Sequence, residues 1–173
     1  TGKPTTVLND ADAAAWGEFR YGAGRGSSRM MFVTVSTGVG AGLILENALL
    51  EGAELGFTRL EDGTPLELTA SGAALDRYAV MRGWNGAQEV LERAGDDGEA
   101  HLLLERTARL ISGKLWDAAQ LLSLERVVVG GGLGLSPGFL ERLRNPVDGR
   151  LEMVPAELGA DAGLIGVANW KGG

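Results

Sequence analysis

Two apolar runs joined by glycines constrain the fold of this chain more than any other feature. Residues 30–35 and 43–45 flank residues 34–42, which read Thr-Val-Ser-Thr-Gly-Val-Gly-Ala-Gly. This pattern predicts two strands joined at a glycine turn. Because glycines let a backbone approach a ligand closely, and Ser36 and Thr37 add hydroxyls, the turn could cradle a phosphate through its N–H groups. The alternative, an ordinary β-hairpin whose glycines only satisfy turn geometry, is favoured when these residues are taken alone.

The composition excludes several classes of protein. The 173 residues fit one domain or a piece of a larger protein, and we expect more protein upstream of Thr1. With 16 Lys and Arg against 23 Asp and Glu, the net charge of −7 argues against a nucleic-acid partner. Without cysteine and with one histidine, the chain cannot form disulfides or Cys-rich zinc sites, which suits a cytoplasmic location. No apolar stretch reaches the roughly 18 residues that a membrane span needs.

The first residues predict a strand followed directly by a helix. Residues 5–8 form a short β-type run, and Asn9 and Asp10 stand before an alanine-rich segment that reaches about Arg20. Asn or Asp is favourable there because its side chain accepts the unpaired N–H groups of the first helical turn. We expect residues 21–28 to form a glycine-rich loop and the main sheet to start at Arg29.

The remainder of the chain predicts an α/β fold. A helix at residues 99–122 has apolar residues at spacings of three and four, and it leads into a buried strand, a glycine turn and another helix. No second domain boundary is evident. The other expected elements are strands at 48–50, 126–129 and 151–154, an extended segment at 65–69, helices at 71–82, 87–93 and 164–170, a helix begun by Ser136 as cap with Pro137 in its first turn, and a turn at 159–163.

Two familiar phosphate-binding loops are excluded by spacing. Gly38, Gly40 and Gly42 lie two apart and lead into a strand, so they do not form the Gly-x-Gly-x-x-Gly fingerprint that opens a helix. Gly113-Lys114 is followed by Leu115 instead of the Ser or Thr of a Walker loop.

Six blocks in order resemble the C-terminal part of the ROK family of sugar kinases and sugar-responsive repressors, within the actin-like ATPase superfamily. They are residues 8–18 (LNDADAAAWGE), 36–42 (STGVGAG), 52–56 (GAELG), 67–72 (ELTASG), 129–132 (VGGG) and 161–166 (DAGLIG). The resemblance implies an actin-like, ribonuclease H-like C-terminal lobe with a mixed sheet flanked by helices. Residues 29–173 would form this lobe, and residues 1–28 would form a strand and helix on the hinge side.

The resemblance implies phosphoryl transfer from ATP to a sugar hydroxyl, which needs a carboxylate to accept the proton. Asp10 matches the family's catalytic base, and Asn9, Glu54 and Glu67 match its sugar-binding residues. Alternatively, Asn9 or Asp10 is only a helix cap, and the two glutamates are solvated loop acids.

The resemblance also implies ATP and Mg²⁺ as cofactors. The second phosphate motif and the adenosine-side loop would be formed by Thr37, Gly38, Gly40, Gly42, Gly131 and Gly132. The alternative for the last two glycines is an ordinary turn from strand to helix.

The chain departs from the family pattern in two places. Phe57 stands where many members have histidine, and the zinc module is replaced by the short turn at residues 62–65, so no structural zinc is expected. The loop could pack around Phe57 instead. His101 is expected on the surface without a catalytic role. The family's first phosphate motif belongs to an N-terminal lobe that these residues do not contain, so this chain alone is not expected to be a complete kinase.

Three hypotheses follow. The first is an ATP-dependent kinase of a hexose or N-acetylhexosamine, acting with its N-terminal lobe as a homodimer. The second is the sugar-sensing domain of a ROK repressor, which would use Asn9, Glu54 and Glu67 without transferring phosphate. The third is a degenerate lobe with only an assembly role. Asp10 together with both glycine motifs favours the kinase, whereas Phe57 favours the sensor.

Overall fold

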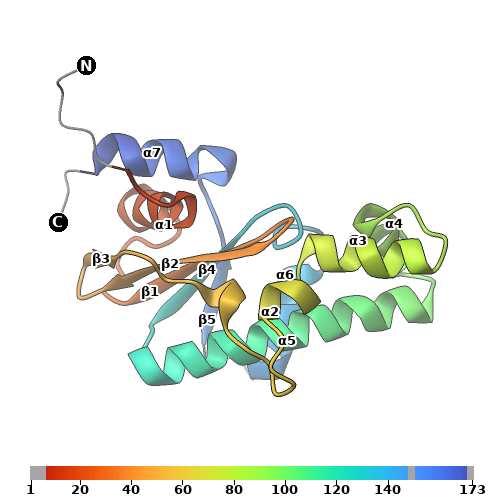
Figure 1. The fold of residues 1–173 in the computed structure, drawn as a ribbon. Coiled ribbons are helices and arrows are strands. Elements are labelled where there is room, and N and C mark those ends of the chain that lie inside the picture. The colour runs from red at the N-terminus through yellow and green to blue at the C-terminus, as the bar shows by residue number, and fades with distance from the viewer. Residues whose placement is uncertain (1–6, 148–150, 171–173) are drawn as a thin grey trace.

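A mixed five-stranded sheet forms the centre of the computed structural model, which describes residues 7–147 and 151–170 (Figure 1). The strand order is β3-β2-β1-β4-β5. The strands are β1 (Met30–Val35), β2 (Val39–Leu45), β3 (Ala48–Leu50), β4 (Arg126–Gly130) and β5 (Glu152–Pro155). The helices are α1 (Asp10–Tyr21), α2 (Leu66–Thr69), α3 (Gly72–Met81), α4 (Ala87–Arg93), α5 (Gly98–Leu122), α6 (Phe139–Arg144) and α7 (Ala162–Asn169), with short 3₁₀ turns at Leu55–Phe57, Asn145–Val147 and Gly159–Asp161.

The sheet brings the two glycine motifs to the same end. Strands β1 and β2 pair antiparallel through Val35 and Val39, which confirms the predicted hairpin. Strand β4 pairs with β1 in parallel, with Thr34 opposite Gly130. The residues that follow β4 therefore lie beside the turn that follows β1.

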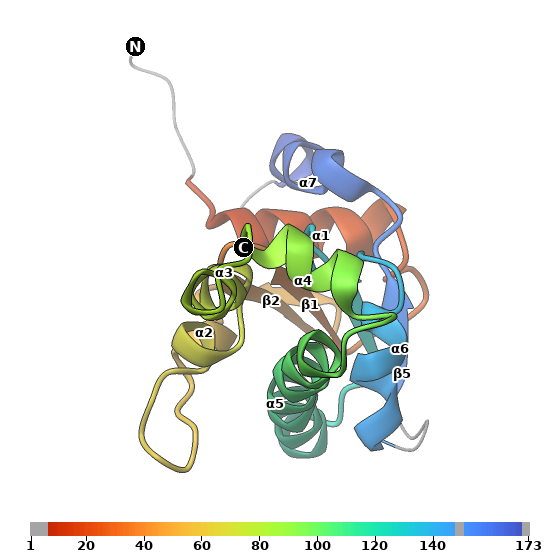
Figure 2. The same cartoon turned by 90° about the vertical axis from the view of Figure 1, so that its right-hand side faces the viewer.

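Helices cover both faces of the sheet. Helices α1 and α7 lie on one face, and α5 and α6 lie on the other (Figure 2). Along β1 the side chains alternate, so Phe32 faces α1 while Val33 faces α5. Both residues are buried, which explains why the strand reads as a continuous apolar run.

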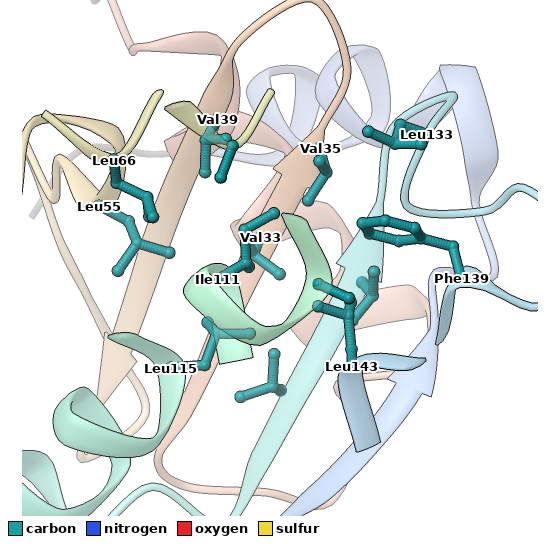
Figure 3. Packing of buried hydrophobic residues seen from close by; sticks show 14 of the residues in the cluster. Val33, Val35, Val39, Leu55, Leu66, Ile111, Leu115, Leu133, Phe139 and Leu143 are labelled. Atoms are coloured by element: carbon teal, nitrogen blue, oxygen red, sulfur yellow. The ribbon is translucent and has the colours of Figure 1, made fainter. Parts of the chain in front are cut away.

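The larger core fills the space between the sheet and α5 (Figure 3). Ile111 and Leu115 project from α5 toward Val33, and neither is exposed to solvent. Their spacing of four residues places both on the same helix face. Helix α5 therefore packs against one face of the sheet, and the other face of the sheet is covered by α1 and α7.

Helices α1 and α7 pack with their backbones in contact. A Cβ atom on Gly166 of α7 would overlap the carbonyl oxygen of Ala13 in α1. In the same way, a Cβ atom on Gly17 of α1 would overlap the carbonyl oxygen of Ala162. The absence of side chains at these two glycines is what permits this approach.

Most of the predicted elements are confirmed, including the long helix and the three strands after residue 45. None of the described helices is long and apolar enough to cross a bilayer. Two segments were predicted wrongly. Residues 65–69 are not extended, because Leu66 is fully buried and its carbonyl accepts the N–H of Ala70 at 2.8 Å, closing the short helix α2. Ser136 does not cap α6, because its hydroxyl donates back to the carbonyl of Leu133 at 2.6 Å.

Three smaller details differ from the expectation. Helix α7 begins at Ala162, so the last two residues of the predicted turn at 159–163 belong to this helix and the first three form a 3₁₀ turn. Helix α6 begins only at Phe139. The predicted strand at residues 5–8 falls mostly outside the described residues, and Val7 and Leu8 belong to no strand.

Replacing Gly166 with alanine should destabilise the fold. The added methyl group would force α7 away from α1, and overpacking of this kind costs about 1–3 kcal/mol. The matched control is Gly113→Ala in the exposed middle of α5, where a Cβ meets nothing within 4 Å. That change should stabilise the protein by up to about 1 kcal/mol through helix propensity. Urea unfolding measures the stability of both variants. A Gly166→Ala variant as stable as Gly113→Ala would refute the close approach of α7 to α1.

Candidate functional site

The first turn of α1 carries the Asn-Asp pair. Asn9 is the N-cap, and its Oδ1 accepts the N–H of Ala11 at 2.8 Å. Oδ1 of Asp10 lies 2.8 Å from the same N–H group. Both side chains are exposed, and an acid in the first turn is stabilised by the helix dipole. Asn9 therefore serves as the cap, which was the structural alternative for this pair.

A cavity of about 420 Å³ opens beside Asp10. The glycines that follow β4 also line it, so the structure brings Asp10, Gly131 and Gly132 to one cavity. Among the described residues of the lining, Asp10 is the one ionisable side chain. The lining consists of Asp10, Ala11, Ala14, Phe32, Thr34, Gly130, Gly131, Gly132, Leu135, Ala156, Gly159, Ala160, Ala162 and Gly163.

The glycines after β4 are anchored to the end of β1. The carbonyl of Val35 accepts the N–H groups of Leu133 and Gly134, both at 3.0 Å. Gly131 has a φ of 83°, and a Cβ there would overlap this carbonyl and lie 2.7 Å from Oγ1 of Thr34. Only glycine fits this position, so the turn can run close to the strand and leave the cavity open.

The hairpin turn is held from outside by α3. The carbonyl of Ser36 accepts the N–H of Gly72 at 2.7 Å, and the carbonyl of Thr37 accepts the N–H of Ala73 at 3.0 Å. The N–H groups of Thr37 and Gly38 donate to no acceptor within the described part of the chain. Because its carbonyls face α3, the turn has two backbone donors left for a ligand.

Glu67 contacts this turn directly. Its Oε2 accepts the N–H of Val39 at 2.8 Å, and a Cβ on Gly38 would overlap the same oxygen. The side chain is half-buried. One predicted sugar-binding residue thus adjoins the predicted phosphate motif, and it also fixes the turn.

Gly40 and Gly42 lie beneath α1, where their missing side chains admit the helix. A Cβ on Gly42 would lie 2.5 Å from the carbonyl oxygen of Ala11 and 2.5 Å from Cβ of Ala15. A Cβ on Gly40 would lie 3.4 Å from Cβ of Ala11. Their packing role is to let α1, and with it Asp10, lie close to the hairpin.

Glu54 is exposed on the loop between β3 and α2, and it lines neither the cavity nor the hairpin turn. The idea that this loop packs around Phe57 is wrong, because Phe57 is 66% exposed. Leu55 is buried in the core instead. His101 lies on α5 and is exposed, in agreement with its expected surface position.

Sequence reasoning missed two buried carboxylates on α1. Glu18 accepts the N–H groups of Ala23 and Leu158, each at 2.8 Å, and that of Glu157 at 3.2 Å. It thereby fixes the segment just before Gly159 in the cavity wall. No sequence signal distinguishes this glutamate from the solvated acids of other helices.

Asp12 is the second missed carboxylate. It is 2% exposed, its Oδ2 accepts the N–H of Gly52 at 3.0 Å, and its Oδ1 has no partner among the described residues. Burial raises the pKa of Asp12, the hydrogen bond from Gly52 opposes this shift, and the charges of Glu51 and Asp10 add to it. Its position three residues after the N-cap predicts a bond back to the cap residue, so the sequence did not indicate its contact with Gly52.

A larger hollow of about 750 Å³ lies against α4, away from these residues. Its lining consists entirely of residues with charged or amide side chains, and it contains no predicted site residue. The lining is Asn85, Gln88, Glu89, Glu92, Arg93, Asp96 and Asp97. We place the site at the smaller cavity because Asp10 and the glycines after β4 line it together.

Comparison with known proteins identifies relatives along the whole chain. The family model described as the ROK family matches residues 1–172. The bifunctional enzyme NanE/NanK of Brucella melitensis is 38% identical over 189 residues, covering 97% of this chain and 35% of the relative. The N-acetylmannosamine kinase of Haemophilus influenzae is 33% identical over 193 residues, covering 98% of this chain and 64% of the relative. The chain thus spans less than two thirds of these relatives.

Two solved structures have the same fold. The ROK family glucokinase of Streptomyces griseus, in complex with glucose and AMPPNP, has a TM-score of 0.84 and 30% identity, covering 98% of this chain and 68% of that one. The ROK hexokinase of Thermus thermophilus has a TM-score of 0.88 and 32% identity, covering 97% of this chain and 67% of that one. The expected actin-like fold, with its mixed sheet flanked by helices, is confirmed.

The pKa shift of Asp12 predicts a pH-dependent gain in stability for Asp12→Asn. A pKa raised in the folded state means that the native protein holds the proton more tightly than the unfolded chain does. The wild type therefore loses stability as pH rises from about 4, the ordinary pKa of aspartate, through the raised value. In urea unfolding, the free energy of unfolding of Asp12→Asn should exceed that of the wild type by more at about pH 7 than at about pH 4.

Asp62→Asn is the control with the opposite sign. The N–H of Thr64 donates to Asp62 at 2.9 Å and lowers the pKa of this exposed carboxyl, so its stabilising effect is present at neutral pH and lost in acid. Because the lowered pKa lies below the ordinary value of about 4, Asp62→Asn should cost stability at about pH 7 and at about pH 4, and lose this cost only in stronger acid. The same pH trend in both variants would contradict the burial of the Asp12 charge.

Proposed function

Since the chain belongs to the ROK family, we propose that it forms the large lobe of an ATP-dependent carbohydrate kinase, which transfers a phosphoryl group to a hydroxyl of a hexose or N-acetylhexosamine. The observation that carries this proposal is the cavity that Asp10 lines together with Gly131 and Gly132. A carboxylate beside a wall of open backbone suits a proton acceptor next to a bound nucleotide.

Asp10 acts as the general base in this proposal. Its carboxylate accepts the proton of the attacking sugar hydroxyl as the bond to phosphorus forms, while the nucleoside diphosphate leaves with the electrons of the broken bond. The position at the start of α1 supports the role, because it places Asp10 in the cavity wall.

The phosphates are held by backbone donors. Thr37 and Gly38 supply the two N–H groups that the hairpin turn leaves without acceptors. Gly131 and Gly132 border the nucleotide, where a side chain would occupy the cavity. Gly40 and Gly42 contribute through packing, since they bring α1 close to the hairpin.

Mg²⁺ would neutralise the phosphate charge when ATP is bound. The described residues contain no group of three His, Asp or Glu side chains placed to hold a metal ion. This fits an ion that is carried mainly by phosphates and water, with Asp10 as the one carboxylate in the cavity wall.

Asn9, Glu54 and Glu67 form the sugar-binding side in this proposal. Asn9 and Glu67 are supported by their positions beside Asp10 and beside the hairpin turn. Carboxylates and amides can accept hydrogen bonds from vicinal hydroxyls. The substrate class follows the names of the relatives, which include N-acetylmannosamine kinases and a glucokinase.

We further propose that an N-terminal lobe completes the site and that the protein is a cytoplasmic homodimer. The relatives are longer than this chain, which supports an additional lobe. The sensor domain of a ROK repressor is less favoured, because a sensor needs neither a proton acceptor nor an open glycine wall.

Asp10→Asn in the full-length protein should lower kcat by about 10²–10⁴-fold, because the amide cannot accept the proton. Sugar affinity should change little, since the amide still hydrogen bonds. The measurement is phosphorylation with MgATP across hexoses and N-acetylhexosamines, alongside calorimetric sugar binding.

The matched control is Asp117→Asn, an exposed aspartate on α5 remote from the cavity, which should leave kcat unchanged. Turnover of Asp10→Asn equal to that of wild type would reject Asp10 as the base. Sugar binding by wild type without phosphorylation of any sugar would replace the kinase by the sensor.

A further inference from the structure

The hydrogen bonding of Asp12 departs from what its sequence position predicts. It lies three residues after the N-cap Asn9, where an acidic side chain commonly returns to the N–H of the cap residue. Its Oδ2 instead accepts the N–H of Gly52, 40 residues away in the sequence. The side chain therefore joins two segments rather than closing its own helix.

This arrangement is unfavourable for the stability of the fold. Asp12 is 2% exposed, and its Oδ1 has no partner among the described residues. A buried carboxylate with a missing partner costs free energy, and the acids Asp10 and Glu51 nearby add repulsion. Helix α1 does not need Asp12 as a cap, because Asn9 already caps it.

The benefit of the contact lies in the loop at residues 51–57. Gly52 follows β3 with a φ of 83°, and its bond to Asp12 is the one side-chain hydrogen bond to residues 51–54 within the described part of the chain. The far end of the loop is anchored separately. Leu55 is buried in the core, and a Cβ on Gly56 would overlap the carbonyl of Val39.

Glu54 lies between these two anchors. One of them, Asp12, lies on the same helical turn as Asp10, which lines the cavity. A single turn of helix thus connects the cavity wall to the loop that carries Glu54. Removing the first anchor would leave the backbone of residues 51–54 held through β3, through Leu55 and through the N–H of Phe57, which donates to the carbonyl of Glu54 at 3.3 Å.

We propose that Asp12 is a positioning residue that holds Glu54 in place relative to Asp10 and thereby sets sugar affinity. The part of this proposal that concerns sugar affinity rests on the kinase function proposed above. The bond between Asp12 and Gly52 can be tested without that function. Asp12 itself contacts no reacting atom and acts only through the loop.

The test compares Asp12→Ala, which removes the acceptor, with Asp12→Asn, which keeps an oxygen in the same place. Hydrogen exchange at the Gly52 amide and the KM values for sugar and ATP are measured in the full-length protein. Asp12→Ala should accelerate exchange at Gly52 and raise the sugar KM about tenfold, with the ATP KM within about twofold of wild type. Asp12→Asn should show exchange at Gly52 and a sugar KM close to those of the wild type.

Glu125→Ala is the matched control. Glu125 also accepts a backbone N–H, that of Ser28 at 2.8 Å, but it is exposed and does not line the cavity. Its removal should accelerate exchange at Ser28 and leave both KM values unchanged. If Asp12→Ala fails to fold, Asp12→Leu fills the same volume without an acceptor and takes its place.

Three results would overturn the proposal. They are unchanged exchange at Gly52 in Asp12→Ala, an unchanged sugar KM despite faster exchange, and an Asp12→Asn variant as impaired as Asp12→Ala. Absence of phosphorylation by wild type would instead overturn the kinase function. Exchange at Gly52 and calorimetric sugar binding would then still decide the role of Asp12.

Discussion

The arrangement of the whole site depends on how closely α1 lies to its neighbours. The helix crosses β2 where Gly42 presents no side chain, and α7 approaches from the other side through Gly166. Steric exclusion sets both distances, because a single methyl group would overlap backbone atoms. Asp10 reaches the cavity wall because its helix is held between these two contacts. The position of Asp10, on which the catalytic proposal depends, is therefore set by the close packing of small residues around α1.

Sequence reasoning recovered the elements whose signals extend over many residues. The helix α5 has a sustained apolar stripe, and the hairpin has two apolar runs that enclose glycines, so both were predicted with nearly the observed bounds. The failures are short segments whose conformation is decided by distant contacts. Leu66 closes a helical turn because the core accepts its side chain, and Ser136 bonds to Leu133 instead of capping α6. Neither outcome is encoded in the adjacent residues.

The candidate site was predictable only in part, for a similar reason. Asp10 and Gly131 stand in motifs whose order along the chain carries the family signal, and the structure brings them to one cavity. Asp12 and Glu18 were missed because their partners are backbone N–H groups of Gly52 and Leu158. Every residue except proline has such a donor, so no pattern of side chains indicates which one a buried acid will find. Only the tertiary fold identifies these contacts.

The carbonyl group of Val35 has a mechanical consequence. One oxygen atom accepts both N–H groups that anchor the turn after β4, and the same residue is the last of β1 before the hairpin turn. A displacement of β1 therefore carries both glycine motifs by the same amount, and their separation is preserved. In the proposed kinase these two motifs form a fixed reference frame, so any adjustment to the length of a bound phosphate chain would come from another part of the protein.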